Sequence, residues 1–320
     1  MKNEQKLRNV SKYFRTLAIY LVLIVLIIIF AVLEPAFIGG NNIITVLRQV
    51  SILGITATGM MLPILLAGID LSVGAIISMV NVGCAYMMVH MGIAPVPAVL
   101  ISLVVATLVG AINGIVIAKV NIPPLIMTYA MQMVLSGCAY ILCKGLPIYG
   151  FTSKFTVIGQ GYVWKIPIPV IIMAVCLIIG AFVLSKTFFG RYFYAVGGNE
   201  EASRLSGINV TFVKVLAYML SGFFSGIAGI VMLSRVNSGT PSAGTGFEMD
   251  VLTAIVLGGV SVNGGRGKVY NVVAGVLIIG VLKNGLVLLN VDTYIQYIVQ
   301  GVILALAVGY DCLQNRRRSI

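Results

Sequence analysis

The chain has 320 residues, 59% of them hydrophobic and 9% charged, with a formal net charge of +12. A soluble globular protein has roughly 25% charged residues, so this composition excludes an ordinary water-soluble domain. The 36 glycines favour closely packed transmembrane helices, because small residues let helix backbones approach one another in lipid. We therefore predict an all-α fold, a polytopic transmembrane helix bundle that forms one domain over residues 1–320.

Ten apolar segments along the chain are candidates for membrane spans, since a helix needs about 20 residues to cross a bilayer. The eighth is too short to cross as a regular helix. The first follows a basic tail at 1–15 and has the layout of a signal peptide, but its apolar run is too long and lacks a cleavage site, so we expect a retained span. The segments are 16–34, 49–67, 71–90, 95–118, 123–143, 167–186, 210–234, 249–262, 270–289 and 293–311.

The basic residues indicate the orientation of these spans. With both termini cytoplasmic, most Lys and Arg residues lie in the inside segments, as the positive-inside rule requires. The positive charge therefore reports membrane topology, and we expect no nucleic-acid partner. Spans two to five and seven to ten would then begin on opposite sides, which is compatible with an inverted repeat.

Polar side chains inside the apolar segments need a partner, a cap or a water-filled path. Asp70 and Ser72 lie between the second and third spans, where Asp70 either caps a helix at the membrane boundary or lines a cytoplasmic gate. Amides within the spans either bond helices together, which is their commoner use, or line the path of a hydroxylated solute. These amides are Asn81, Asn113, Gln132, Asn284 and Asn290.

The segment 187–209 carries the strongest local signals. Asn199 is a good helix N-cap, Glu200 and Glu201 place negative charge at the positive end of a helix, and Gly207 is a natural stop. They predict a helix of about two turns, from Glu200 to Ser206. So short a helix is unstable alone, so we expect it to dock.

Two docking surfaces for this helix are open. Its Ala202 and Leu205 offer an apolar face, bordered by polar contacts from its glutamates and Arg204. The face either binds a separate partner or lies on the chain's own bundle.

Between residues 234 and 250 a stretch rich in Gly, Ser and Thr leads to Glu248 and Asp250. It is either a broken element beside a translocation path, since irregular backbone at membrane depth must be buried or line a cavity, or an external loop with both acids solvated. The later run GGRGK at 264–268 lacks the spacing of a phosphate-binding loop, so we expect no nucleotide site in this chain. The five cysteines and one histidine suggest no metal site and no catalytic centre.

Three blocks of the sequence resemble a known family. The first block is Glu201-Ala202-Ser203 followed by Gly207. It resembles the start of the EAA motif, by which importer permeases present a coupling helix to their ATPase subunits. The Ile-x-Leu-Pro that completes the motif is absent. GIDLSVG at 68–74 and the segment 238–268 resemble ribose-type sugar permeases of ATP-binding-cassette importers. The likeness extends in order from about residue 45 to residue 310.

The resemblance implies a permease subunit of the inner (cytoplasmic) membrane that is not itself an enzyme. Its implied partners are cytoplasmic ATPase subunits that hold ATP and Mg²⁺, an extracytoplasmic sugar-binding protein, and a second permease that is a copy or a paralogue. Ribose is the leading substrate, and xylose, galactose-type sugars and autoinducer-2 stay open. The implied coupling residues are Asn199, Glu200, Glu201, Ala202, Ser203, Arg204, Leu205 and Gly207.

Basic residues on the outside are candidates for docking an acidic surface of the binding protein. They are Arg48, Lys144, Lys154 and Arg235. Two other functions compete with the importer. An ion-driven secondary transporter would need buried titratable pairs, and a lipid-modifying membrane enzyme would need a nucleophile or a metal cluster; the sequence pattern points to neither.

Overall fold

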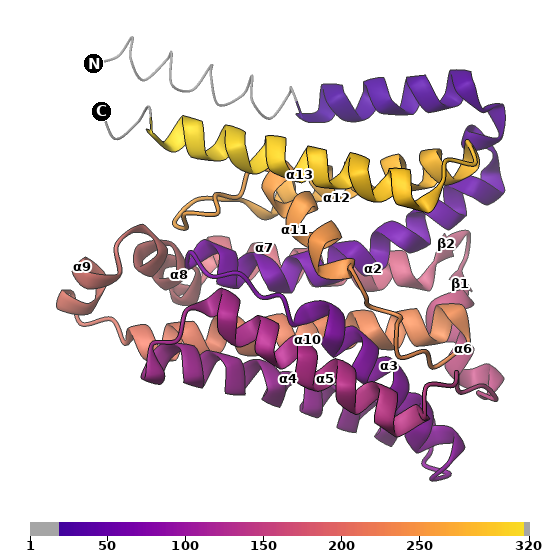
Figure 1. The fold of residues 1–320 in the computed structure, drawn as a ribbon, viewed down its shortest axis with the longest axis horizontal. Helices are drawn as coiled ribbons and strands as arrows, with labels where there is room; N and C mark the ends of the chain where they lie inside the picture. Colours follow the sequence, from indigo (N-terminus) through magenta and orange to yellow (C-terminus); the bar gives the residue numbers. More distant parts are fainter. Residues whose placement is uncertain (1–18, 317–320) are drawn as a thin grey trace.

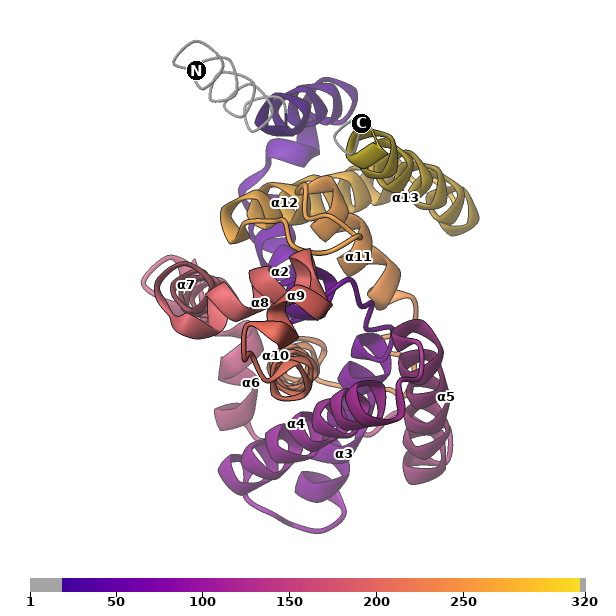
Figure 2. The same cartoon turned by 90° about the vertical axis from the view of Figure 1, so that its left-hand side faces the viewer.

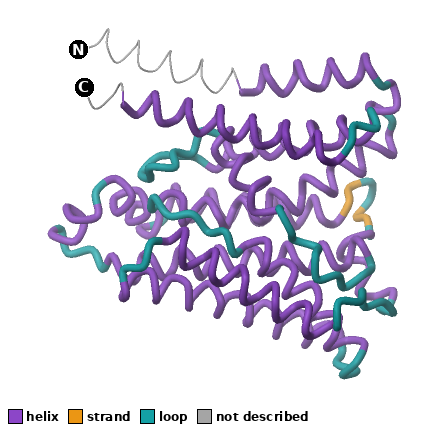
Figure 3. The backbone as a smooth tube through the Cα atoms, in the orientation of Figure 1, coloured by secondary structure: helices purple, strands orange, loops and turns teal. Residues whose placement is uncertain are grey.

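The computed structural model describes residues 19–316, and it confirms a helical bundle with long apolar helices (Figures 1 and 3). The described part departs from helix in turns, loops and one small antiparallel hairpin, in which β1 (Tyr162–Val163) pairs with β2 (Ile166–Pro167). The basic tail expected at 1–15 lies outside the described residues.

Seven helices of the described part are long and apolar enough to cross a membrane. They are α2 (Gly40–Leu65), α4 (Pro95–Val120), α5 (Pro124–Cys143), α7 (Ile168–Lys186), α10 (Val210–Val236), α12 (Val269–Leu288) and α13 (Thr293–Arg316).

Two shorter apolar helices, Ile19–Leu33 and α3 (Val73–Val89), and the short α11 (Phe247–Leu257) occupy the other expected segments. The protein is therefore a multi-pass membrane protein, and the count of about ten crossings with cytoplasmic termini stays a prediction. The remaining short helices are η1 (Pro35–Ile38), α6 (Ser153–Gln160), α8 (Phe188–Gly198) and α9 (Glu200–Leu205).

One expected boundary was wrong, and one helix was not predicted. Helix α2 begins at Gly40 rather than at residue 49, so Arg48 lies within a helix. The segment 187–209 contains α8 before the expected short helix. The Thr187 side chain caps α8 by accepting from the Gly190 N–H (3.4 Å), and Phe193 and Val196 bury its apolar face. Its three glycines have low helix propensity, which obscured it in the sequence.

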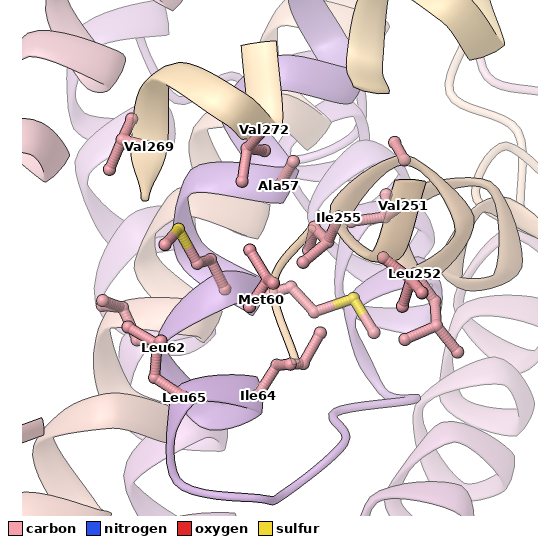
Figure 4. Close-up of a cluster of buried hydrophobic side chains, with 14 of the residues drawn as sticks. Ala57, Met60, Leu62, Ile64, Leu65, Val251, Leu252, Ile255, Val269 and Val272 are labelled. Carbon is pink, nitrogen blue, oxygen red and sulfur yellow. The ribbon is translucent and has the colours of Figure 1, made fainter. Parts of the chain in front are cut away.

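Helix α10 is the centre of the bundle, packed against α4, α2 and α3. Figure 2 looks along the long helices from the end that carries α8 and α9, and Figure 1 places α6 and the hairpin at the opposite end. The largest buried apolar cluster joins the second half of α2 to α11 and α12, as Met60, Ile255 and Val272 illustrate (Figure 4).

The connections 66–72 and 237–246 return the chain into the interior of this bundle. Helix α2 ends because Ala67 adopts a left-handed conformation (φ 58°). The Gly68 N–H then donates to the Pro63 carbonyl and the Ala67 N–H to the Ile64 carbonyl, which is the Schellman pattern of a helix end. Helix α3 starts shortly afterwards among buried residues, so the break between α2 and α3 lies inside the protein.

Small residues form the crossing of α4 and α10, where Gly110 and Gly114 of α4 and Gly222 and Gly226 of α10 face the other helix. A Cβ added to Gly110 of α4 would collide with the Tyr218 carbonyl, and one added to Gly222 of α10 would collide with the Ala106 carbonyl. Backbone therefore touches backbone where α4 crosses α10.

This crossing gives a first prediction. Gly222→Ala should lower the free energy of unfolding by about 1–3 kcal/mol, the usual cost of overpacking, because two backbones must separate. Gly83→Ala on α3 is the matched control, since its Cβ would meet nothing within 4 Å. Thermal unfolding in detergent micelles measures both. An unchanged midpoint for Gly222→Ala would contradict the described crossing.

Candidate translocation path and coupling surface

The short helix α9 has the caps that the sequence predicted. The Asn199 side chain accepts from the Ala202 N–H (2.9 Å), and Gly207 takes a left-handed conformation (φ 82°) just after the helix. The helix ends at Leu205, one position earlier than expected, with Ser206 as its C-cap. Local capping therefore defines both ends of the helix.

The apolar face of α9 points to solvent. Leu205 is 81% exposed and Ala202 is exposed, whereas Ser203 is buried and donates to the Asn199 carbonyl (2.8 Å). Helix α9 protrudes at one end of the molecule (Figures 1 and 2). The alternative that its apolar face lies on the chain's own bundle is therefore wrong.

Ion pairs hold the polar side of α9. Arg204 pairs with Glu200 (3.2 Å) and Glu201 (3.4 Å), and Lys214 of α10 pairs with Glu200 (2.8 Å). The pairs within the helix are exposed and add little stability. The Lys214 pair fixes the orientation of α9 against the start of α10, which leaves the Leu205 side free.

Asp70 is the centre of a buried hydrogen-bond network. Its Oδ1 accepts from the N–H (3.0 Å) and hydroxyl (2.5 Å) of Ser72, and its Oδ2 accepts from Ser221 of α10 (2.7 Å). Asn113 of α4 donates to the Ser72 hydroxyl (3.0 Å). Asp70 thus joins the start of α3 to two other helices.

The position of Asp70 corrects one expectation. Its partner Ser221 lies well inside α10, which is about 40 Å long at 1.5 Å per residue. Asp70 itself is 0% exposed. The alternative that Asp70 caps a helix at the membrane boundary is therefore wrong, although its side chain does accept from a backbone N–H at the start of α3.

A second polar cluster joins α11 and the segment before it to α3 and α5. Gln132 of α5 donates to Glu248 (3.0 Å), and the backbone N–H of Thr240 donates to Asn81 (2.7 Å). Glu248 and Asp250 are 6% and 4% exposed. The alternative of an external loop with both acids solvated is thus wrong, and the irregular segment 237–246 is partly buried, with Ser238, Gly239, Pro241 and Gly244 inside the protein.

The partners of Asp250 were not predicted from the sequence. Lys283 of α12 forms an ion pair with it, and Gln300 of α13 donates to its other carboxylate oxygen. A lysine inside an apolar run was the available signal, because such a charge needs a partner. A reciprocal amide pair between Asn42 and Asn284 (2.8 and 2.9 Å) shows Asn284 bonding helices together.

The four basic candidates for docking separate into two groups. Arg48 donates to the Gln160 carbonyl (2.6 Å) and lies over the Tyr162 ring (4.8 Å), while the Arg235 carbonyl accepts from Gln160 (3.1 Å). Both arginines are partly buried. Lys144 and Lys154 are exposed at the same end of the molecule.

The Asp70 network gives a second prediction. Asp70→Ala should lower the free energy of unfolding by about 1–3 kcal/mol for each buried donor left without an acceptor, whereas Asp70→Asn keeps one acceptor and should cost less. Ser206→Ala, on the exposed α9, is the control. Thermal unfolding in detergent provides the measurement, and equal midpoints for wild type and Asp70→Ala would contradict the network.

Comparison with known proteins identifies the family. The family model described as "Branched-chain amino acid transport system / permease component" matches residues 42–308. The chain is 42% identical to the ribose import permease protein RbsC of Bacillus subtilis over 97% of both chains. It is 41% identical to that of Escherichia coli K12 over 90% of this chain and 91% of the relative.

The L-arabinose transport system permease protein AraH of Escherichia coli K12 is 39% identical over 92% of this chain and 89% of its own length. No solved structure matches the chain. The matched region includes the α2–α3 break, α9 and α11, so the features described above lie within the shared part. The chain therefore belongs to the family of transport-system permease components that includes these ribose import permeases, as its sequence resemblance predicted.

Proposed function

We propose that the chain is the membrane-spanning subunit of an ATP-binding-cassette importer that carries ribose across the inner (cytoplasmic) membrane. The near full-length similarity to ribose import permeases supports the substrate class. The alternative substrates are xylose, galactose-type sugars and autoinducer-2. For xylose there is support from a xylose transport permease that is 33% identical to the chain. The observation that carries the proposal is helix α9, which is capped at both ends and exposes its apolar face to solvent.

In the proposed mechanism, partner ATPase subunits hold ATP and Mg²⁺ and bind the exposed face of α9. Closure of these subunits would move α9 and switch the path between outward and inward access. Asn81, Gln132 and Glu248 supply amide and carboxylate groups near the meeting point of α3 and α11, which suit the hydroxyl groups of a sugar.

A second permease, a copy or a paralogue, would close the open side of the path. Among the seven long helices, α13 and α5 are the least buried within the chain. They nevertheless carry Gln300 and Gln132, which bind the buried acids of α11. Each of these helices is mostly exposed within one chain but makes a polar contact with its interior. Such helices are suited to an interface between two permeases.

One observation favours the ion-coupled alternative. The Asp250–Lys283 pair joins a buried carboxylate to a partly exposed lysine, and a secondary transporter would need titratable pairs of this kind. Gln300 also binds Asp250, so the group connects α11, α12 and α13 as a structural link would. Uptake by purified permease in proteoliposomes with an imposed proton gradient and no ATPase tests the alternative: uphill ribose movement there would overturn the importer proposal.

The coupling surface gives the third prediction. Replacing Glu201 with Ala and Leu205 with Asp should reduce ATP-dependent ribose uptake by roughly tenfold or more, since exposed apolar anchors carry much of the energy of an interface. Leu205 makes little contact within the chain, so expression and thermal stability should not change. Ser206→Ala on the same helix is the matched control. Uptake is measured in proteoliposomes with the ATPase and the binding protein.

If ribose uptake by the wild-type permease did not need the ATPase, the proposed importer function would be overturned. Uptake by the Glu201/Leu205 variant that equals wild type would instead overturn the role of α9.

The fourth prediction concerns the extracytoplasmic end. Lys144→Glu combined with Lys154→Glu should weaken binding of the sugar-loaded binding protein several-fold, and the loss should shrink at high salt because exposed charges are screened. Arg48→Ala should instead destabilise the hairpin, since Arg48 holds Gln160 and Tyr162. Titration in lipid nanodiscs at two ionic strengths measures affinity. Identical affinity before and after the lysine changes would contradict this surface.

A further inference from the structure

The loop between α11 and α12, which contains the GGRGK run, contacts two other segments at the α9 end of the molecule. The Gly265 N–H donates to the carbonyl of Leu65, the last residue of α2 (2.8 Å). Gly264 and Gly265 both have positive φ (82° and 67°), a conformation that glycine adopts without steric cost. The two glycines thus allow the loop backbone to reach the end of α2.

Helix α8 reaches the same point through Gly197. A Cβ on Gly197 would collide with the Leu65 carbonyl and lie 2.7 Å from the Gly265 nitrogen. A Cβ on Gly264 would lie 2.8 Å from the Gly197 carbonyl oxygen. Three backbones therefore meet without intervening side chains. We call Leu65, Gly197, Gly264 and Gly265 the glycine junction.

Two side chains reinforce the junction. The Tyr194 hydroxyl of α8 donates to the Gly267 carbonyl (2.7 Å), and burial raises the pKa of Tyr194, so the phenol stays protonated and able to donate. Asp311 of α13 accepts from the Ser261 hydroxyl (3.0 Å) and the Val262 N–H (3.2 Å). The α11–α12 loop is thereby held on both sides.

The junction is rigidly connected to α9. Asn199 is at once the C-cap of α8, donating its N–H to the Ala195 carbonyl (3.0 Å), and the N-cap of α9. No flexible linker separates the two helices, so a displacement of α9 must move Gly197. On its other side the junction continues through Leu65 into the segment 66–72 and its buried Asp70.

From this arrangement we propose that the glycine junction transmits displacement of α9 to the α2–α3 break and to the α11–α12 loop, and so acts as a positioning element for the path. The inference rests on the proposed coupling role of α9. Direct backbone contact suits this task because it leaves no side-chain rotamers to absorb the motion. Rigid elements with close packing are the physical carriers of coupling between distant sites.

The test compares two adjacent glycines of α8. Gly197→Ala places a methyl group inside the junction, whereas Gly198→Ala adds one that meets nothing within 4 Å. The complete transporter, with ATPase and binding protein, is reconstituted in proteoliposomes. Three quantities are measured: copurification of the ATPase, ATP hydrolysis, and ribose moved per ATP.

We expect Gly197→Ala to bind the ATPase and hydrolyse ATP like wild type, but to move roughly tenfold less ribose per ATP, the size of a typical coupling between sites. Gly198→Ala should match wild type within about twofold, as changes in open space do. An unchanged ratio for Gly197→Ala would overturn the proposal. Loss of ATPase binding by Gly197→Ala would also overturn it, because the junction would then only support α9.

A milder change keeps the inference testable if the Gly197→Ala permease does not fold. Tyr194→Phe removes one hydroxyl that donates to Gly267, and we expect a several-fold fall in ribose per ATP with ATP hydrolysis retained. If Gly197→Ala cannot be obtained as a folded protein, an unchanged ratio in Tyr194→Phe would reject the junction as a transmitter. A failure of the importer proposal can be told apart from a failure of the junction proposal, because ribose uptake by the wild-type transporter would then not require ATP.

Discussion

Backbone N–H and C=O groups that lie inside an apolar bundle must find partners within the protein, because lipid offers none. The segments 66–72 and 237–246 meet this requirement with side chains from neighbouring helices. Thr128 of α5 accepts from the Leu71 N–H (3.1 Å), and Ser78 of α3 accepts from the Gly244 N–H (2.9 Å). Thr128 and Ser78 therefore have a structural task before any task in transport.

The need to pair buried backbone groups also explains why glycine is required where the starts of α3 and α11 meet. A Cβ on Gly74 would collide with the Gly244 carbonyl and with Glu248, and a Cβ on Gly244 would collide with the Gly74 carbonyl. The starts of α3 and α11 thus approach each other closely, and both helix N-termini carry acidic residues nearby, in accord with the direction of the helix dipole. The two breaks form one polar region, which lies within the matched part of the chain.

Features whose cause lies within a few residues were predictable from the sequence. The caps of α9 and the apolar runs of the long helices are of this kind, because Asn199 and Gly207 act on their immediate neighbours. Features that depend on contacts between helices were not. The choice between a boundary cap and a gate residue stayed open for Asp70 because its partner Ser221 is distant in sequence, and Lys283 had no visible partner until the fold placed Asp250 beside it.

The same distinction explains why helix α8 and the contacts of Arg48 were not predicted. Glycine at Gly190 and Gly197 argues against a helix in isolation, yet at Gly190 a Cβ would collide with the Leu184 backbone and at Gly197 with Leu65. Close packing thus selects the residue that local propensity disfavours. Arg48 was expected just outside the second span, and its guanidinium contacts the Gln160 carbonyl and the Tyr162 ring, which are distant in sequence.

The segment 66–72 is the part of the interior best suited to change shape. It is anchored at one end by the Schellman bonds to Pro63 and Ile64 and at the other by Asp70. Between these anchors it has no helical hydrogen bonds to break, so a movement there costs less than bending α2 or α10. Because one anchor lies beside the backbone contact with α8 and the other beside α3, a shift at the α9 end is converted into a shift at the start of α3.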